Sequence, residues 1–446
     1  MSSSYFELGL ISSFLLYLLF TRKIVKKVGL LSLSFFFLFF FGLYSYSVPL
    51  SVILELPLGE YRKDYISAWE DVDVTLISFV LMNHLALFAM IIAYLLNVPK
   101  LRILKCQENN FNKRNFFRFA IILGCLSSVF ELINFLRVGG PKILFSGKLA
   151  YQSAINDASL MLPSEIFFYL SIIFFTLSLE KVTLKKILFF ISANVVYISF
   201  NMIIGERGTF VIALASSLIA YFYFRINISI KTSSIIIGLI FYVFFSVLTV
   251  YRNVYDSGLK VTFSDGIKYV KEHVDLIGFV LNPANSEFGT SCLNYRVAHD
   301  RTHQFEYRYG GTYLHVYSQL LPKVVNPFYD KSETIKYRDK YFPERGKKGS
   351  IGGTAYSSIY EAYLNFGYLG ALIVFFLIFT FILNLEITRH TTISLFSVLI
   401  YVLCFELVIL FPRSAFEYVF QKFIFIILLS FIVSVLARLR FKTTRK

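Results

Sequence analysis

The sequence predicts an all-α polytopic membrane protein with about eleven transmembrane helices and one large external loop that contains short helices. Three observations predict this class. The 446 residues are 56% hydrophobic and 18% aromatic, with a mean hydropathy of +0.64, which leaves too little polar surface for a soluble protein. Apolar stretches of about 18 residues or more recur, each long enough to cross a bilayer as a helix. The short loops between them are alternately basic and poor in basic residues.

The predicted spans can be taken in chain order. The first, "YFELGLISSFLLYLLF", has neither a basic segment before it nor a small-residue cleavage site. It is therefore expected to be an anchor rather than a removable signal. The eleven expected spans cover roughly residues 4–20, 29–53, 74–96, 117–136, 162–179, 185–204, 209–224, 233–251, 357–384, 391–411 and 416–437.

Basic loops follow the odd-numbered spans, from "TRKIVKK" after the first to the tail "ARLRFKTTRK" after the last. Because Lys and Arg are retained on the cytoplasmic side, the N-terminus is expected outside and the C-terminus in the cytoplasm. The net charge of +16 is thus explained by topology, and no nucleic-acid partner is expected. The four cysteines, Cys106, Cys125, Cys292 and Cys404, are too widely separated to indicate a disulfide framework or a metal site.

The loop between the eighth and ninth spans divides the chain into three parts. Residues 1–251 would hold transmembrane helices 1 to 8, residues 252–354 the external loop, and residues 355–446 helices 9 to 11 with the basic tail. A loop of this length without structure of its own would be unusual, so it is expected to fold into short elements.

Charged residues near the spans are expected to gather at the outer ends of the helices. Charges within a membrane are costly, so their placement is informative. A solvated helix end explains any one of them, but the set together indicates an outward-facing polar site. Its members are Glu131, Arg137, Glu165, Glu206, Arg207, Arg252, Glu361, Arg413, Glu417 and Lys422, with Glu406 alone expected deeper.

The segment "GSIGGTAYSSIYEAYLNFGYLGALIVFF" leads from the loop into the ninth span. If a helix begins at Thr354, helical spacing places Thr354, Ser357, Ser358, Glu361 and Asn365 on one stripe. This stripe is either a hydrogen-bonded contact with another helix or a carboxylate presented to a substrate at the membrane surface. Gly367 and Gly370 would allow a neighbouring helix to approach closely.

Three segments carry a family resemblance. "GGTYLHVYSQLLPK", followed by "GGTAYSSIYEAYLNFGYLG", resembles the large external loop of Wzy-type polymerases, the oligosaccharide repeat-unit polymerases of O-antigen and capsule pathways. "GERG", at 205–208, is also similar to that family, and the close similarity covers 310–370 in addition. The chain has Pro322-Lys323 where Pro-Arg is commoner, and an Arg-x10-Gly spacing occurs from Arg338 to Gly349.

The resemblance implies a GT-C-like fold, a bacterial inner-membrane location and a reaction. Undecaprenyl-pyrophosphate-linked oligosaccharide units would be joined at the outer face, by attack of a sugar hydroxyl on the anomeric carbon of the growing chain. The leaving pyrophosphate needs fixed cations, for which arginine is best suited. Tyr313 and Asn365 would also contact the substrate. The expected pyrophosphate ligands are Arg207, Arg252, Arg338, Arg345 and Arg413.

A base for the attacking hydroxyl is expected among Glu361, His299, His303 and His315. His299 and His303 also have a helical metal-ligand spacing, but with no further ligand at fixed spacing neither a metal nor another cofactor is expected.

The resemblance also implies partners: the bilayer, a Wzz-type chain-length regulator and a flippase. Three other functions stay open: an O-antigen ligase with the same donor, a lipid-linked oligosaccharide flippase or transporter, and a scaffold. A transporter would need polar residues deep in several spans or inverted repeats, which the sequence does not show.

Overall fold

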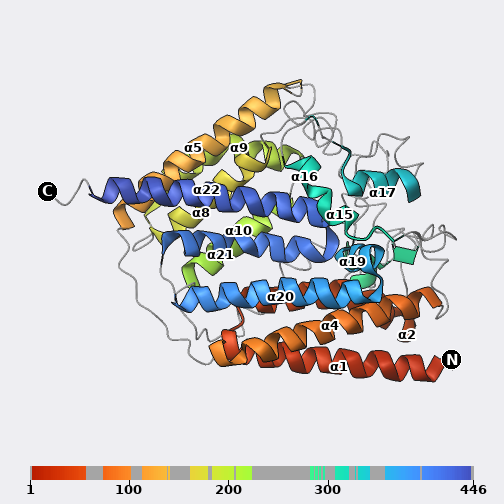
Figure 1. Ribbon diagram of the computed structural model, residues 1–446. Helices are drawn as coiled ribbons and strands as arrows, with labels where there is room; N and C mark the ends of the chain where they lie inside the picture. The colour runs from red at the N-terminus through yellow and green to blue at the C-terminus, as the bar shows by residue number, and fades with distance from the viewer. Residues whose placement is uncertain are drawn as a thin grey trace.

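A computed structural model of the chain describes residues 3–56, 74–101, 113–137, 139–140, 161–178, 183–204, 207–222, 282–285, 287–289, 291–292, 295–296, 307–320, 327, 330–341, 357–391 and 394–442. Every regular element within these ranges is a helix. The long helices form one bundle, with the short helices at one of its ends (Figure 1). The all-α prediction is confirmed.

Within the described residues, eight helices are long and apolar enough to cross a membrane. They are α1 (Ser3–Val28), α2 (Leu33–Ile53), α4 (Val74–Leu101), α5 (Lys113–Arg137), α9 (Leu184–Ile204), α20 (Tyr368–Thr391), α21 (Leu395–Leu410) and α22 (Phe416–Lys442). Two shorter apolar helices, α8 (Met161–Leu177) and α10 (Arg207–Phe222), match the fifth and seventh predicted spans. The eighth predicted span, 233–251, lies outside the described residues.

The bundle consists of two groups of helices joined through α21. One group contains α1, α2, α4 and α20, and the other contains α5, α8, α9 and α10. Helix α21 packs against members of both groups and against α22. Its apolar window is 83% buried, against 33% for α20 and for α22. A helix that is apolar on all sides has to lie inside the protein or in lipid. Helix α21 lies inside the protein.

Small and polar side chains join α5, α8 and α9 within the second group. Ser127 Oγ donates to the Ser164 carbonyl at 2.8 Å, and Ser128 Oγ donates to the Ala193 carbonyl at 2.9 Å. Gly124 leaves the space that the amide of Asn194 fills, since an added Cβ would lie 2.6 Å from its Nδ2. In an apolar solvent, close approach and interhelical hydrogen bonds of this kind hold helices together.

The ninth predicted span, 357–384, is a broken helix, so the prediction of one continuous span is wrong. A short helix, α19 (Ser358–Phe366), ends at Gly367, and α20 begins at Tyr368. Gly367 has φ +62°, a left-handed conformation that favours glycine, and its N–H donates to the Tyr363 carbonyl at 2.7 Å. A Cβ on Gly370 would meet the Ala362 carbonyl oxygen at 1.9 Å. Gly370 thus permits the close approach of α19 itself, whereas the neighbour at Gly367 is Tyr307, whose hydroxyl would lie 3.2 Å from an added Cβ.

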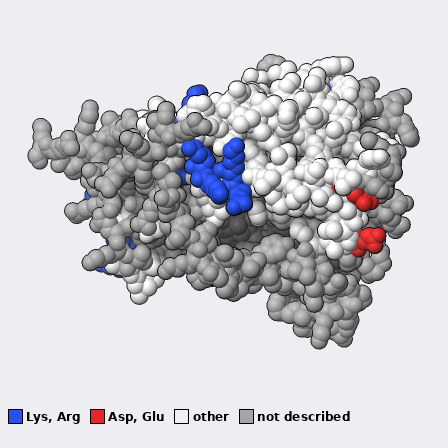
Figure 2. All heavy atoms as spheres, turned by 90° about the horizontal axis from the view of Figure 1, so that it is seen from below, with Lys and Arg blue, Asp and Glu red and all other residues white. Residues whose placement is uncertain are grey.

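The two ends of the bundle differ in charge. The N-terminus lies at the end that carries the short helices, and the C-terminus lies at the other (Figure 1). Basic residues occupy the last turns of α1, α4 and α20, with Lys26, Lys27, Lys100 and Arg389 among them. On the face that includes α1, Figure 2 shows Lys and Arg gathered in one group and the acidic residues apart, toward the end with the N-terminus.

Candidate functional site

Four short helices meet the start of α22 at the end of the bundle opposite the C-terminus (Figure 1), two by packing and two through hydrogen bonds. Three of them belong to the large loop: α15 (Gly311–Leu314), α16 (Val316–Gln319) and α17 (Glu333–Tyr341). The fourth is α19. The expectation that the loop contains short helices is therefore met, and these helices bring several predicted site residues together.

The Glu361 carboxylate lies at the centre of one set of contacts. Its Oε1 accepts a hydrogen bond from Thr312 Oγ1 at 2.7 Å, and its Oε2 accepts one from the Phe416 N–H at 2.7 Å. Asn365 Nδ2 donates to Thr312 Oγ1 at 2.7 Å and to the Glu361 carbonyl at 2.8 Å. Glu361 thereby ties α15 of the loop to α19 and to the N-terminus of α22, where an acceptor is favoured.

Burial controls the protonation of this carboxyl. Glu361 is 1% exposed and precedes the span that begins at Tyr368. Desolvation raises its pKa from 4.5 to about 8, against the opposing effects of the Thr312 and Phe416 hydrogen bonds. At neutral pH the group is therefore mainly a neutral carboxylic acid.

The predicted polar stripe on α19 faces the interior of the protein. Ser357, Ser358, Glu361 and Asn365 are all at most 3% exposed, and Thr354 lies outside the described residues. Of the two readings of the stripe, this geometry matches the hydrogen-bonded helix contact. Sequence periodicity could not separate the two readings, because it does not show which side of α19 is buried: Ile359 and Ala362 on the apolar side are buried as well, whereas Phe366 is 41% exposed.

A pair of substitutions separates a positioning role for Glu361 from a charged one. We expect Glu361→Gln to fold normally, since glutamine resembles the neutral acid. Glu361→Ala leaves the Thr312 hydroxyl and the Phe416 N–H without their acceptor, at about 1–3 kcal/mol for each unsatisfied group. Thermal unfolding of the purified variants measures the difference, and equal loss in both would contradict a neutral Glu361.

The raised pKa also predicts how stability depends on pH. Between the unfolded pKa near 4.5 and the folded value of about 8, the folded state binds more protons at Glu361. Wild-type stability should therefore fall as pH rises through this window. The Glu361→Gln variant should lack this component of the slope.

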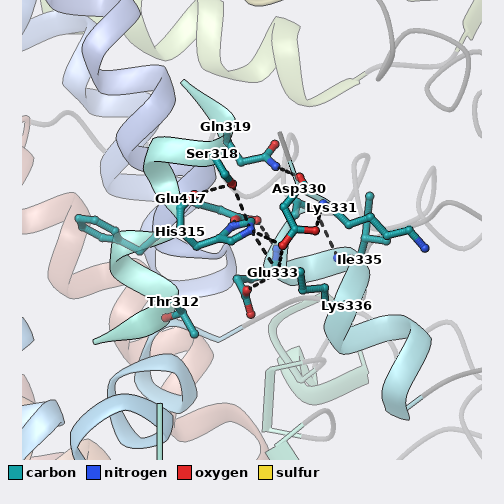
Figure 3. A network of polar contacts seen from close by, with 12 residues as sticks. Thr312, His315, Ser318, Gln319, Asp330, Lys331, Glu333, Ile335, Lys336 and Glu417 are labelled. Carbon is teal, nitrogen blue, oxygen red and sulfur yellow. Dashed lines mark hydrogen bonds and ion pairs between the residues drawn. The ribbon is translucent and has the colours of Figure 1, made fainter. Parts of the chain in front are cut away.

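His315 lies at the centre of a second polar network (Figure 3). This network is more open to solvent, since the side chains of Lys336 and Asp330 are 34% and 53% exposed. Its Nδ1 lies 2.7 Å from Glu417 Oε2, so Nδ1–H donates to the carboxylate. Its Nε2 lies 3.1 Å from Ser318 Oγ, and the remaining two neighbours are charged: Lys336 Nζ at 3.2 Å and Asp330 Oδ2 at 3.3 Å.

Glu417 also fixes α17 in place. Its Oε1 accepts a hydrogen bond from the Glu333 N–H, the first of α17, at 2.7 Å. Lys336 extends from the same helix and pairs with Asp330 Oδ2 at 2.5 Å and Glu333 Oε1 at 3.1 Å. One carboxylate at the start of α22 therefore orients His315 and caps the helix that carries Lys336.

Three groups of this network have shifted pKa values. Burial lowers the pKa of Lys336, but its hydrogen bonds to Asp330 and Glu333 outweigh this and raise it. The hydrogen bond to Glu417 raises the pKa of His315 above 6.5, although partial burial opposes it. The hydrogen bond from Lys336 lowers the pKa of Asp330. A histidine whose Nδ1–H is held by a carboxylate presents Nε2 as a proton acceptor, and Asp330 lies ready to hold the proton that Nε2 gains.

The structure describes some of the remaining predicted site residues with their side chains, some by their backbone alone and some not at all. Tyr313 packs between Phe366, at 6.1 Å, and Phe416, at 5.0 Å between ring centroids. Arg413 ends the short 3-10 helix η4 (Phe411–Arg413) and is half-buried. Arg207 is the first residue of α10 and Arg338 lies within α17, but their side chains are not described. The predicted residues outside the described part of the chain are Arg252, His299, His303 and Arg345.

Two of the predicted outer-end charges, Glu165 and Lys422, form a buried cluster with Glu406. Lys422 of α22 is 1% exposed and pairs with Glu165 Oε2 of α8 at 2.9 Å and with Glu406 of α21. The Tyr169 hydroxyl donates to Glu165 Oε1 at 2.9 Å. Glu406 is expected from the sequence to be the one charge that lies deeper than the rest, and the structure pairs it with Lys422, which also contacts Glu165.

Sequence reasoning missed Lys336 and Asp330 altogether. Both are ordinary charges in a polar loop, and no spacing connects them with Glu417. The available signal was His315 itself, one of the four histidines and carboxylates considered as a base. Within the described residues no group of three or more His, Cys, Asp and Glu side chains is arranged to hold a metal ion.

Comparison with known proteins gives one result that spans the chain. The family model described as O-antigen polysaccharide polymerase Wzy matches residues 2–446. No match was found among curated proteins or among solved structures. The matched range includes both polar networks and all the described helices. The chain therefore belongs to the O-antigen polysaccharide polymerase Wzy family.

Proposed function

We propose that this polymerase joins undecaprenyl-pyrophosphate-linked oligosaccharide repeat units at the outer face of the bacterial inner membrane, with His315 as its general base. Family membership supports polymerisation of lipid-linked units in general terms. The single observation that carries the residue assignment is the 2.7 Å pair of His315 Nδ1 and Glu417 Oε2. It supplies an oriented imidazole at the start of a membrane-spanning helix, where the reacting end of a lipid-linked substrate has to lie.

In the proposed step, a sugar hydroxyl of one unit takes the place of Ser318 Oγ beside His315 Nε2. Ser318 does not depend on that contact, because its hydroxyl hydrogen can be donated to the His315 carbonyl, 2.8 Å away. The hydroxyl oxygen bonds to the anomeric carbon of the growing chain while its proton passes to Nε2. The bond from that carbon to the pyrophosphate breaks, and its electron pair leaves on the phosphate oxygen. General-base assistance of this kind contributes about 10²–10⁴-fold.

The leaving pyrophosphate gains negative charge and requires cations close to the base. Lys336, whose ammonium lies 3.2 Å from His315 Nε2, is one candidate. Arg338 lies two residues further along the same helix, and Arg413 ends η4 just before α22. We assign the leaving group to these cations together with Arg207 at the start of α10, and to Arg252 and Arg345 outside the described residues. Guanidinium groups bind phosphate in a bidentate manner and keep their charge.

Glu361 and Asn365 then act as positioning residues rather than as contacts to the reacting atoms. The buried neutral carboxyl fixes α15, which ends immediately before His315. Tyr313 packs against Phe366 and Phe416 at the same junction. We leave His299 and His303 as alternative bases.

The arrangement of the ends supports the proposed orientation. The N-terminus and the site share one end of the bundle, and the basic last turns of α1, α4 and α20 point to the other (Figures 1 and 2). By the positive-inside rule the site end faces outward. A flippase would deliver the units there, and a Wzz-type regulator would set the chain length.

The test is reconstitution. Purified protein in vesicles is incubated with undecaprenyl-pyrophosphate-linked repeat units, and the products are resolved on a gel. A ladder with steps of one repeat unit is expected. Single additions to a lipid A core acceptor, with no ladder, would identify a ligase and overturn the proposal.

A further inference from the structure

The turn before α15 holds a tyrosine in an unfavourable conformation. Tyr309 has φ +46° and Gly310 has φ +87°, and the Gly311 N–H donates to the Arg308 carbonyl at 2.8 Å. Positive φ at both central residues is the requirement of a type I′ turn, which favours Asn, Asp or Gly. For a bulky residue such a φ is unusual and strained. Burial of the ring does not offset this strain, because Tyr309 is 80% exposed.

The turn is held rigidly against the end of α19. The Arg308 N–H donates to the Leu364 carbonyl at 2.9 Å. Gly310 lies so close to Phe366 that an added Cβ would meet its ring at 3.2 Å. Tyr307, which is 43% exposed, lies 6.2 Å from Tyr309 and 6.4 Å from Tyr363, between ring centroids. Two exposed rings are thus presented on a fixed backbone, just before α15 begins at Gly311.

We propose that Tyr309, together with Tyr307, is a subsite that binds one pyranose ring of the oligosaccharide. The inference rests on the proposed function and adds a specific contact to it. A pyranose has an apolar C–H face that packs on an aromatic ring, and hydroxyls that bond to the phenol and to nearby polar groups. Strained positions persist where a precise placement is useful. A tyrosine that only touched fluid lipid headgroups would gain nothing from a fixed direction.

The position suits the reaction. Tyr309 is separated from His315 by the single helix α15, which Glu361 fixes through Thr312. A sugar stacked on Tyr309 would belong to the same unit as the hydroxyl at His315 or to the unit next to it. The subsite therefore supplies affinity for the chain without contacting the reacting atoms.

Tyr309→Asn provides a test because asparagine suits the turn and lacks the ring. Its thermal unfolding midpoint should be equal to or higher than that of the wild type. Its KM for lipid-linked repeat units should rise about threefold to tenfold, the scale of one aromatic contact, with kcat little changed. Tyr309→Phe keeps the ring and should keep most of the affinity.

The possible outcomes separate the two proposals. If the wild type produces no ladder, the proposed function fails. If it produces one and Tyr309→Asn has an unchanged KM, only the subsite is wrong. Contact with lipid is tested by Tyr309→Trp in a Trp69→Phe background, since Trp69 is the one native tryptophan. Fluorescence should be quenched by added repeat-unit oligosaccharide and not by brominated lipid. Quenching by the lipid alone would overturn the sugar subsite.

Discussion

Replacing His315 with alanine is expected to lower the polymerisation rate by about 10²–10⁴-fold, the usual contribution of a general base. The variant should still insert and fold, because His315 lies between the short loop helices α15 and α16 and is not part of the bundle core. The measurement is the initial rate of ladder formation with purified protein at saturating substrate. Ser318→Ala is the matched control, because Ser318 contacts the same nitrogen of His315 but takes no part in the proposed proton transfer. The rate of this variant should stay within a few-fold of the wild-type rate.

The pH dependence distinguishes a base from a merely structural histidine. A base works in its neutral form, so the acidic limb of the rate profile should lie above pH 6.5, the ordinary value that Glu417 raises. Glu417→Gln removes the charge that raises this pKa, and the limb should move to lower pH. A limb that stays in place in Glu417→Gln, or a His315→Ala variant with normal rate, would exclude His315 as the base.

The same shift affects stability in the opposite direction. Because the folded pKa of His315 is raised, the protonated pair stabilises the protein fully below the unfolded value of about 6.5. This contribution is lost as the pH rises through the folded pKa. The polymerisation rate should therefore rise over the same pH range in which this contribution to stability is lost. A histidine with a structural role alone would not produce such a rise.

The candidate site could be predicted from the sequence only as a set of residue types. His315 was one of four possible bases, and Glu417 one of ten charges near the outer ends. Nothing in a single sequence connects residues 102 positions apart. The connection arises because α22 begins where α15 and α16 end, a consequence of how the loop folds back on the bundle. Lys336 and Asp330 depend on the same folding, and no local pattern marks them.

The spans were more predictable, because length and hydropathy are local properties. Helices α1, α2, α4 and α5 lie where the apolar windows predict them. The break at Gly367 is different. The sequence "YLNFGYLGAL" is apolar on both sides of the glycine, so a hydropathy window continues across it. What ends α19 is the positive φ of Gly367. The short helix before it carries Glu361, which bonds to α15 and α22.

Replacing Lys422 with methionine is expected to be the most destabilising single change in the bundle. Its ammonium is the charge shared by Glu165 and Glu406, and all three side chains are buried. Methionine fills a similar volume but leaves two carboxylates without a cation. Breaking a buried ion pair in this way costs about 3–5 kcal/mol. The yield of folded protein in detergent and its thermal unfolding midpoint measure the loss.

Further substitutions separate two causes of the stability lost in Lys422→Met: the uncompensated carboxylates and the loss of packing. Lys331 pairs with Asp339 at 3.5 Å on the surface, with Lys331 69% exposed. Lys331→Met should therefore cost at most about 1 kcal/mol. A combined variant, Lys422→Met with Glu165→Gln and Glu406→Gln, removes the uncompensated charges and should recover much of the stability that Lys422→Met loses. If the combined variant is as unstable as Lys422→Met, the cluster is required for its packing and hydrogen bonds rather than for its charge balance. If Lys422→Met alone is stable, the cluster does not join α8, α21 and α22 as its geometry implies.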